Sequence, residues 1–490
     1  GAEIRKNEYR KLQQFSFANT DRFRTSSLVT RLTGDVTNIQ NSISTGMRPA
    51  CRAPVMMITA IAVSFYINKE LAVIFLIAAP VLGVLLFLII SHVRPLYARM
   101  QKAVDLVNRI IQENLTAIRV VKSYVRGDYE LSKFEEVNAG LQTTSERAFR
   151  VASLNMPAMQ FVMYTTILCI LWFGGNLILA GGMKVGELTG FLSYVLQVLN
   201  SLMMISNVFM MFTRSLTSWK RITEVMDEKI DITEDDARDI TVEKGDIEFD
   251  HVYFKYSSQA KEYVLSDISL KMEAGQTIGI IGRTGAAKTT LVQLIPRLYD
   301  VTEGQIRIDG HPVQEYPLKP LRDAIAMVLQ KNTLFSGTVR DNLRWGKEDA
   351  TEEEIEEACR IACVDEFIGR LENGYDTDLG QGGVNVSGGQ KQRLCIARAL
   401  LKKPKVLILD DSTSAVDTAT EAKIREGMAK SLPGTTKIII AQRISSVAHA
   451  DKIVILEDGK IHAAGTHEEL LKNNLIYQEI YQSQQEGADL

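Results

Sequence analysis

Cysteine is scarce in this sequence of 490 residues, and its five cysteines form no metal-binding pattern. They stand at Cys51, Cys169, Cys359, Cys363 and Cys395. Cys359 and Cys363 share an expected helix, but no second Cys or His pair completes a zinc site. We therefore interpret all five as reduced packing thiols.

A basic face and an N-terminal leader are also missing. The sequence holds 56 Lys and Arg against 59 Asp and Glu, a net charge of −3, without a long basic stretch. Proteins that bind nucleic acid usually carry such a face, so no nucleic-acid partner is expected.

The chain begins at Gly1 inside a helical pattern, without Met or a signal peptide. We expect that it is truncated at the N-terminus.

Charge is nearly absent from four long stretches of the first 215 residues. These stretches cover about residues 51–67, 71–90, 155–180 and 188–212. A helix of about 20 apolar residues crosses the hydrocarbon core of a bilayer, so we predict four membrane spans. Asn68–Glu70 separates the first two spans, which should form a hairpin. A bundle of buried soluble helices is the alternative, but four separate apolar runs disfavour it.

The segment between the second and third spans, Ser91–Ser153, is polar, helical and rich in Lys and Arg. Because loops with an excess of Lys and Arg stay on the cytoplasmic side, we place it in the cytoplasm. It is too long and periodic for a simple loop. We predict two long helices that extend the spans into the cytosol and turn near Gly127. An even number of spans then leaves both ends of the membrane domain, residues 1–225, in the cytoplasm.

The pattern changes after this region. Residues 226–243 are acidic and poor in apolar side chains, which indicates a linker. From residue 244 to 490, short β-branched runs alternate with helical stretches. Such alternation is typical of an α/β domain with a largely parallel sheet. The predicted fold class is therefore an α-helical transmembrane domain followed by an α/β domain.

A glycine-rich loop joins one expected strand, Thr277–Ile281, to a helix. Its residues are Gly282, Arg283, Thr284, Gly285, Ala286, Ala287, Lys288, Thr289 and Thr290. In a P-loop, backbone N–H groups and the helix N-terminus hold the phosphates. Lys288 would reach the β- and γ-phosphates, and the Thr289 hydroxyl would bind Mg²⁺. Strand, loop, Lys, Thr and helix in this order predict a P-loop NTPase domain that binds ATP with Mg²⁺.

One residue of this loop departs from the usual pattern. The position before Lys288, commonly Gly, is Ala287 here. Glycine is used where the backbone must approach a ligand closely or adopt a positive φ. We therefore expect weakened, but not abolished, nucleotide binding.

A second phosphate-site element follows downstream. The apolar run Val406–Leu409 ends in Asp410, as in a Walker B strand that delivers a carboxylate to Mg²⁺. Alone, this pattern would also fit a core strand that ends in a turn aspartate. The P-loop upstream favours the role in metal binding.

Together these motifs resemble the ABC transporters, and the resemblance covers essentially the whole chain. Ser387, Gly388, Gly389 and Gln390 match the signature motif of that family, with Val386 where Leu is commonest. Tyr256 stands where the family stacks an aromatic ring on adenine. Gln330 fits the Q-loop, so it would belong to the catalytic site and to the metal ligands. Ser414–Asp417 fits the D-loop. Spans fused ahead of one nucleotide-binding domain look like the exporter branch.

The resemblance implies an architecture and an activity. Exporter halves usually carry six spans, so the first and most of the second would precede this sequence. Two halves would dimerise, with ATP between one half's P-loop and the other half's signature helix. Ser387–Gln390 and Asp417 would then act in trans on the partner's ATP. The chain would drive export as an integral protein of a bacterial inner or plasma membrane, with its nucleotide-binding domain in the cytoplasm.

In exporters, short transverse coupling helices link the long helices to the nucleotide-binding domains. We expect them near Thr20–Leu28 and Val120–Asp128, although a solvated charged face is the alternative for both. The spans hold no convincing charged residue as a substrate site. Their apolar character favours an amphipathic or lipid-like small molecule as cargo. Membrane lipid is the expected partner of the spans themselves.

Two catalytic positions also depart from active members of the family. A Glu usually follows the Walker B aspartate, and here it is Asp411, with a reach shorter by roughly 1.5 Å. A His usually follows the next core strand, and here it is Gln442, which takes up no proton. With Ala287, these changes predict the degenerate half of a heterodimer whose partner retains Glu and His. The alternatives are a homodimeric exporter with slow turnover and a non-transporting, ATP-gated regulator.

Overall fold

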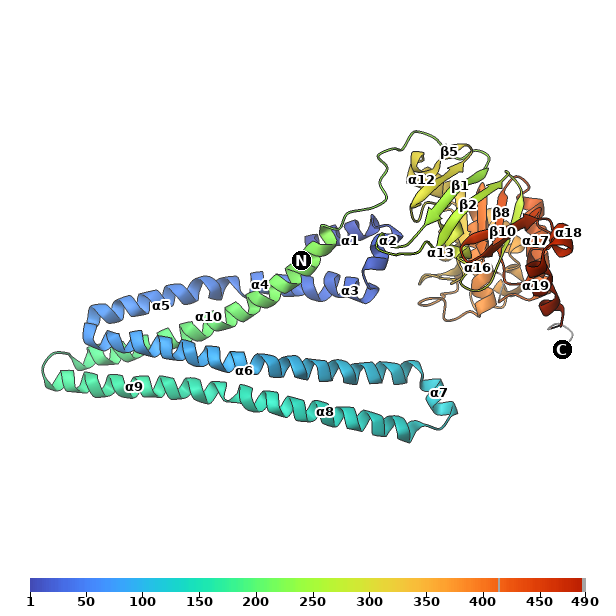
Figure 1. The fold of residues 1–490 in the computed structure, drawn as a ribbon. Coiled ribbons are helices and arrows are strands. Elements are labelled where there is room, and N and C mark those ends of the chain that lie inside the picture. Colours follow the sequence, from blue (N-terminus) through green and yellow to red (C-terminus); the bar gives the residue numbers. More distant parts are fainter. Residues whose placement is uncertain (413–414, 487–490) are drawn as a thin grey trace. The chain divides into compact units, whose positions relative to one another are not determined.

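The computed structural model describes residues 1–412 and 415–486, which form two compact units (Figure 1). The first unit comprises Gly1–Arg10 and Ser26–Asp227. The second comprises Lys11–Thr25 and the chain from Glu228 onward. The short segment Lys11–Thr25, which the sequence places in the 1–225 domain, is thus grouped with the C-terminal unit.

The first unit is built of helices. In chain order they are α1 (Ala2–Gln13), α3 (Thr25–Thr30), the turn η1 (Arg31–Asp35), α4 (Val36–Ser44), α5 (Met47–Ile67), α6 (Lys69–Thr116), α7 (Ile118–Ser123), α8 (Gly127–Ser153), α9 (Asn155–Leu179) and α10 (Val185–Met226). Four stretches of these helices are long and apolar enough to cross a membrane. The prediction of a helical membrane domain with four apolar helices is confirmed.

The expected hairpin between the first two spans has a simple local cause. Helix α5 ends at Ile67, and the Asn68 side chain caps α6 by accepting hydrogen bonds from the N–H groups of Glu70 and Leu71, at 2.9 and 3.1 Å. Side-chain oxygens of this kind satisfy N–H groups that the first helical turn leaves unpaired. One asparagine therefore ends one span and starts the next.

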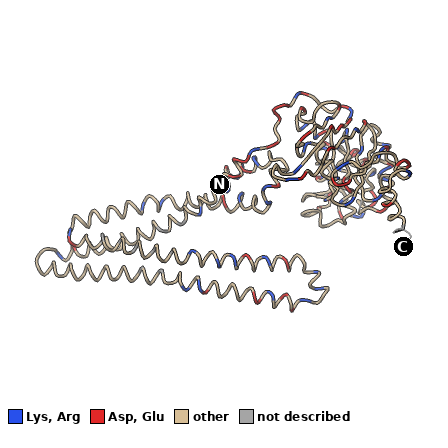
Figure 2. The backbone as a smooth tube through the Cα atoms, in the orientation of Figure 1, with Lys and Arg blue, Asp and Glu red and all other residues tan. Residues whose placement is uncertain are grey.

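Large apolar side chains point outward from these helices. Phe87, Phe161, Trp172 and Phe209 each expose 71–72 % of their surface. Figure 2 shows Lys and Arg repeatedly along the parts of α6 and α8 that lead to α7, whereas the opposite parts of this hairpin carry little charge. An exposed apolar band next to basic helix ends matches spans that continue into the cytoplasm.

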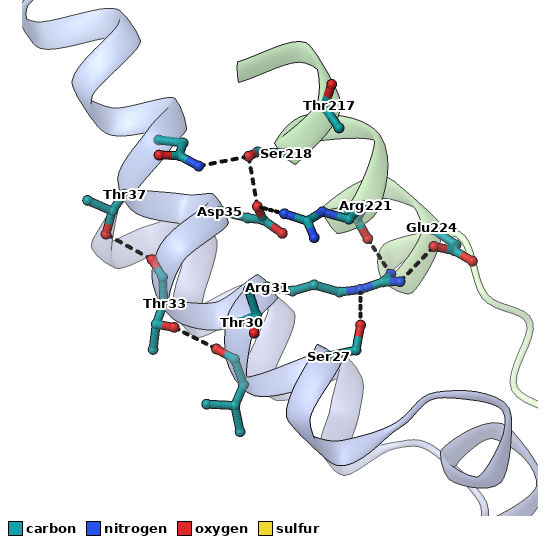
Figure 3. A network of polar contacts seen from close by, with 12 residues as sticks. Ser27, Thr30, Arg31, Thr33, Asp35, Thr37, Thr217, Ser218, Arg221 and Glu224 are labelled. Carbon is teal, nitrogen blue, oxygen red and sulfur yellow. Dashed lines mark hydrogen bonds and ion pairs between the residues drawn. The ribbon is translucent and has the colours of Figure 1, made fainter. Parts of the chain in front are cut away.

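A network of charged side chains joins η1 to the end of α10 (Figure 3). The guanidinium of Arg31 donates to the Arg221 carbonyl and to the Glu224 carboxylate, at 2.5 and 2.8 Å. The buried Asp35 carboxylate accepts from the Ser218 hydroxyl at 2.7 Å and from the Arg221 guanidinium. Arg31 and Asp35 are buried, whereas Glu224 and Arg221 are about half exposed, so each buried charge is paired with an opposite charge at the surface.

Glu8 on α1 lies beside this network and is fully buried. Within the described part of the chain, neither of its carboxyl oxygens has a hydrogen-bond partner. Burial raises the pKa of Glu8 to about 7, although Arg31 acts in the opposite direction. Burial thus favours the neutral form of the Glu8 carboxyl.

The second unit contains two β-sheets (Figure 1). The smaller sheet is antiparallel, in the order β2–β1–β4–β5, and the larger sheet has the order β10–β9–β3–β8–β7–β6. The strands are β1 (Ile247–Phe254), β2 (Leu265–Met272), β3 (Thr277–Ile281), β4 (Glu303–Ile308), β5 (His311–Pro312), β6 (Ile325–Val328), β7 (Val406–Asp410), β8 (Thr436–Ile440), β9 (Lys452–Glu457) and β10 (Lys460–Gly465). Only β10 pairs antiparallel in the larger sheet, so the predicted, largely parallel core is confirmed.

Helices cover these sheets and connect their strands. They are α11 (Lys288–Gln293), α12 (Leu318–Ala324), α13 (Val339–Arg344), α14 (Glu352–Ile361), α15 (Asp365–Ile368), α16 (Gly388–Leu401), α17 (Thr418–Ser431), α18 (His467–Asn473) and α19 (Leu475–Glu486). The strands β3, β7 and β8 are almost entirely buried, which explains their uninterrupted β-branched and leucine-rich sequences.

The segment Lys11–Thr25 carries a short helix, α2 (Phe17–Arg22). Asp21 accepts a hydrogen bond from the Tyr299 hydroxyl at 2.8 Å, and the Phe17 ring lies 5.9 Å from the Tyr299 ring. These contacts group α2 with the second unit.

Helices α2 and α7 each begin slightly before the ranges expected for the coupling helices. For α2 the cause is a capping box between Ser16 and Asn19, which starts the helix early.

Candidate functional site

The candidate site lies where several parallel strands end at one edge of the larger sheet. The register pairs Ile280 of β3 with Ile440 of β8, and Ile440 with Asp410 of β7. The P-loop follows β3, Asp411 follows β7, and Gln442 comes two residues after β8. Because the carboxyl ends of parallel strands meet at the same edge, residues far apart in the sequence converge there.

A pocket of about 290 Å³ opens at this edge. Its lining residues are Val264, Thr284, Gly285, Ala286, Ala287, Lys288, Thr289, Thr290, Gln330, Asp410, Asp411, Ile440 and Gln442. The structure thus brings together most of the P-loop, the Q-loop glutamine, both aspartates and the residue in the histidine position. Gly282 and Arg283 begin the same loop without lining the pocket.

Lys288 and Asp410 are the charged groups at the base of the pocket. The Lys288 ammonium donates to the carbonyls of Gly282 and Arg283 at 2.8 and 3.0 Å. Burial lowers the pKa of Lys288, and the two aspartates act in the opposite direction. The Thr289 hydroxyl donates to the Asp410 carboxylate at 2.8 Å, and burial raises the pKa of Asp410 despite this bond. A cation beside Asp410 would relieve the cost of burying its charge.

Ala287 adopts a left-handed backbone conformation, with φ of 66° and ψ of 25°, directly before α11. This conformation brings Cβ close to the following carbonyl and costs roughly 1–2 kcal/mol in residues other than glycine. The geometry explains why glycine suits this position. The strain therefore lies in the backbone of the P-loop at Ala287.

We expect Ala287→Gly to relieve this strain and to remove a methyl group from the phosphate side of the loop. Affinity for a fluorescent ATP analogue, measured by titration, should rise by about fivefold, which corresponds to about 1 kcal/mol. The thermal unfolding temperature measured without nucleotide should also rise, because relief of the backbone strain stabilises the folded chain. Ala286→Gly, at a buried position without positive φ, is the control and should lower stability instead. Unchanged affinity of the Ala287→Gly chain would contradict this expectation.

The two residues at the catalytic positions contact each other. The Gln442 side-chain amide donates to the Asp411 carboxylate at 2.8 Å. The backbone of Asp411 has a positive φ of 49°, and its N–H donates to the Ile440 carbonyl at 3.0 Å. The side chains that replace the usual Glu and His therefore form one hydrogen-bonded pair inside the pocket.

Tyr256 lies beside the P-loop helix instead of lining the pocket. Its hydroxyl is 2.8 Å from the Thr290 hydroxyl, and its ring packs edge-on against Phe254 and Tyr299. The Tyr256 side chain is 46 % exposed, so part of it can still contact a ligand.

The signature residues form the start of α16, away from the pocket lining. Ser387 caps this helix: its hydroxyl accepts from the Gln390 N–H, and the Gln390 side chain accepts from the Ser387 N–H at 2.8 Å. A Cβ on Gly389 would lie 2.8 Å from the Ala415 carbonyl oxygen, which explains the glycine. The N–H groups of Gly388 and Gly389 thus stand at a helix N-terminus, where anions bind readily.

The D-loop is described only in part, because Ser414 lies outside the described residues. Asp417 is exposed and caps α17 by accepting from the Thr420 N–H at 2.9 Å. This hydrogen bond lowers the pKa of Asp417. Like the signature residues, Asp417 does not line the pocket of its own chain.

The sequence analysis did not identify two glutamines that hydrogen-bond the backbone of the site loops without lining the pocket. The buried Gln392 of α16 donates to the Asp411 carbonyl at 3.2 Å and accepts from the Ala415 N–H at 3.0 Å. Gln484 of α19 bonds the backbone on both sides of Arg443. Gln392 stands two residues after the signature motif, which offered a weak signal, whereas no motif pointed to Gln484.

Comparison with known proteins agrees with this geometry. Residues 1–202 match the model of the ABC transporter transmembrane region, and residues 265–414 match the model of the ABC transporter domain. The chain is 42 % identical to the uncharacterised ABC transporter ATP-binding protein YfiB of Bacillus subtilis, over 99 % of this chain and 85 % of that protein.

Two further relatives are exporters or flippases by description. The chain is 35 % identical to an ATP-dependent lipid A-core flippase of Desulfotalea psychrophila, over 94 % of this chain and 80 % of that protein. It resembles the structure of a bacterial Atm1-family ABC exporter with ATP bound, at a TM-score of 0.84 and 25 % identity, over 99 % of this chain and 84 % of the other. Motifs, fold and relatives agree that the chain belongs to the ABC transporters, as an exporter half-transporter with its transmembrane domain fused to its nucleotide-binding domain.

Proposed function

We propose that this chain is the subunit with the degenerate ATP site in a heterodimeric ABC exporter, and that its signature motif serves the partner's ATP. The hydrogen bond between Asp411 and Gln442 carries the proposal. A primary amide stays neutral and takes up no proton, unlike the imidazole of histidine. This pair can hold a phosphate or a water molecule, but it is poorly suited to removing a proton from an attacking water.

The same site fits bound ATP with Mg²⁺. Magnesium takes oxygen ligands and commonly keeps one or two carboxylates together with phosphate oxygens and water. The Thr289 hydroxyl and the Asp410 carboxylate, 2.8 Å apart, supply such oxygens, and Gln330 lines the same pocket. When bound, the ion neutralises phosphate charge. Lys288 would turn from the loop carbonyls to the β- and γ-phosphates, and Tyr256 would stack on adenine.

The signature helix supplies the catalytic contribution to the other subunit. Helix α16 is 14 residues long, and its first N–H groups belong to Gly388 and Gly389. The Ser387 hydroxyl and these N–H groups would donate to the γ-phosphate of the partner's ATP. The partner would retain the Glu and the His that this chain replaces by Asp411 and Gln442.

The membrane domain, residues 1–225, would move a small amphipathic or lipid-like molecule outward. The apolar spans without a convincing charged substrate site favour such a cargo, and so does the similarity to a lipid A-core flippase. Residues 226–243 would link this domain to a cytoplasmic nucleotide-binding domain, residues 244–490. The short helices α2 and α7 would transmit the closure of the nucleotide-binding domains to the spans.

ATPase measurements on the purified chain test this proposal. The chain alone should hydrolyse ATP very slowly, because a misplaced base costs about 10²–10⁴-fold. Addition of a half-transporter that has the Walker B Glu and the switch His should restore hydrolysis, and native mass determination should find one copy of each. Robust ATPase activity from the chain as a homodimer would refute the heterodimer.

A further inference from the structure

The C-terminal helix α19 reaches the loop that carries Gln442. The Gln484 side-chain oxygen accepts from the Ile444 N–H at 2.8 Å. Its side-chain nitrogen donates to the Gln442 carbonyl at 2.8 Å. A backbone N–H only donates and a carbonyl only accepts, so these partners fix the orientation of the Gln484 amide. The Gln484 amide therefore makes one donor and one acceptor bond to the loop backbone, as the backbone of a neighbouring β-strand would.

The far end of α19 is anchored in the protein core. Tyr477 is fully buried, and its hydroxyl lies 2.6 Å from His467 Nδ1 of the preceding helix. The Gln478 side chain donates to the Leu471 carbonyl at 2.7 Å. Gln484 lies two turns further along, so the loop is tied to a helix that packing already fixes in place.

Gln392 of α16 holds the backbone of Asp411. It contacts the Asp411 carbonyl and the Ala415 N–H and is 1 % exposed. The backbones of Asp411 and Gln442 are thus each held by a glutamine, from two different helices. A hydrogen bond within the pair at 2.8 Å requires both backbones to stay in position.

We propose that Gln484 is a positioning residue that holds the loop of Gln442, so that the Gln442 amide points at the terminal phosphate of ATP bound at this chain's own P-loop. This role rests on the proposed function, because it requires that this site binds ATP. Gln442 and Asp411 line the pocket beside Thr289 and Asp410, where the metal and the terminal phosphate would lie. ADP lacks the γ-phosphate that this amide would contact, so Gln484 acts on the preference for ATP over ADP.

The experiment compares the affinities of the full-length purified chain for trinitrophenyl-ATP and trinitrophenyl-ADP. Wild type should prefer the ATP analogue. Gln484→Ala should reduce that preference by about fivefold, the effect of losing the one hydrogen bond from the Gln442 amide to the γ-phosphate. Gln484→Glu can accept from the Ile444 N–H but cannot donate to the Gln442 carbonyl, so it should behave as Gln484→Ala does. Gln485→Ala is the matched control, because Gln485 bonds only Tyr481 among the contacts of its side-chain amide in the described chain.

A double-mutant cycle separates positioning from general support of the fold. If Gln484 acts through Gln442, then Gln484→Ala should leave the nucleotide preference unchanged in a Gln442→Ala background. An equal effect in both backgrounds would overturn the positioning role, and so would an equal loss of affinity for both analogues. A wild-type chain that binds neither analogue would reject the proposed function together with this role. A wild-type preference that Gln484→Ala retains in full would reject the positioning role alone.

Discussion

Replacement of Ser387 is expected to abolish most ATP hydrolysis in the complex of this chain with a catalytically intact partner. Ser387 and the N–H groups of Gly388 and Gly389 stand at the N-terminus of α16, outside the pocket of their own chain. Loss of one preorganised donor to a transition-state phosphate typically costs about 10²–10³-fold in rate. Steady-state ATPase measurements on the reconstituted heterodimer should show a loss of this size for Ser387→Ala.

Ser387 also caps its own helix, so stability must be separated from catalysis. Ser387→Asn keeps a side chain that caps well but alters the donor offered to phosphate, and it should lose hydrolysis with little loss of stability. Thr351→Ala removes a comparable cap from α14, remote from the signature motif in sequence. It should cost about 1 kcal/mol of stability and leave hydrolysis intact. Full hydrolysis with Ser387→Ala would show that the signature of this chain takes no part.

The strands and motifs of the nucleotide-binding domain could be predicted because their signals are local. Strand β3 and the P-loop form one continuous stretch from Thr277 to Thr290, and the run Val406–Leu409 is apolar because both faces of β7 are buried. Parallel strands then bring the loops that follow them to one edge. The residues that line the pocket are therefore mostly those that motif spacing identified.

Contacts between distant segments left no such signal. Asp21 and Tyr299 are hydrogen-bonded across 278 residues of sequence, and this bond helps to group α2 with the C-terminal unit. The pairing of Gln484 with the Gln442 loop depends on where α18 and α19 pack, which no short pattern encodes. Glu8 likewise looks like an ordinary helical surface residue in the sequence, but it is buried where α1 lies against η1, to which Arg5 is hydrogen-bonded.

If the site is degenerate as proposed, placing Glu and His at positions 411 and 442 should raise the ATPase activity of this chain. We expect the double variant Asp411→Glu with Gln442→His, purified alone, to hydrolyse ATP about 10²–10⁴-fold faster than wild type, the usual contribution of a well-placed general base. The backbone of Asp411 is held by the Ile440 carbonyl and by Gln392, so a longer side chain should extend into the pocket without moving the loop. Single-turnover hydrolysis of ATP measures this gain directly.

The single variants should show that the two positions act together. Asp411→Glu alone regains the reach of the carboxylate but leaves the neutral Gln442 amide beside it, so its gain should be smaller than that of the double variant. Gln442→His alone places an imidazole against a carboxylate that is too short, so its gain should be smaller still. Adding Asp410→Asn to the double variant removes the carboxylate proposed to bind Mg²⁺ and should eliminate the activity. A double variant that binds ATP normally but hydrolyses it no faster than wild type would contradict the proposed role of the Asp411–Gln442 pair.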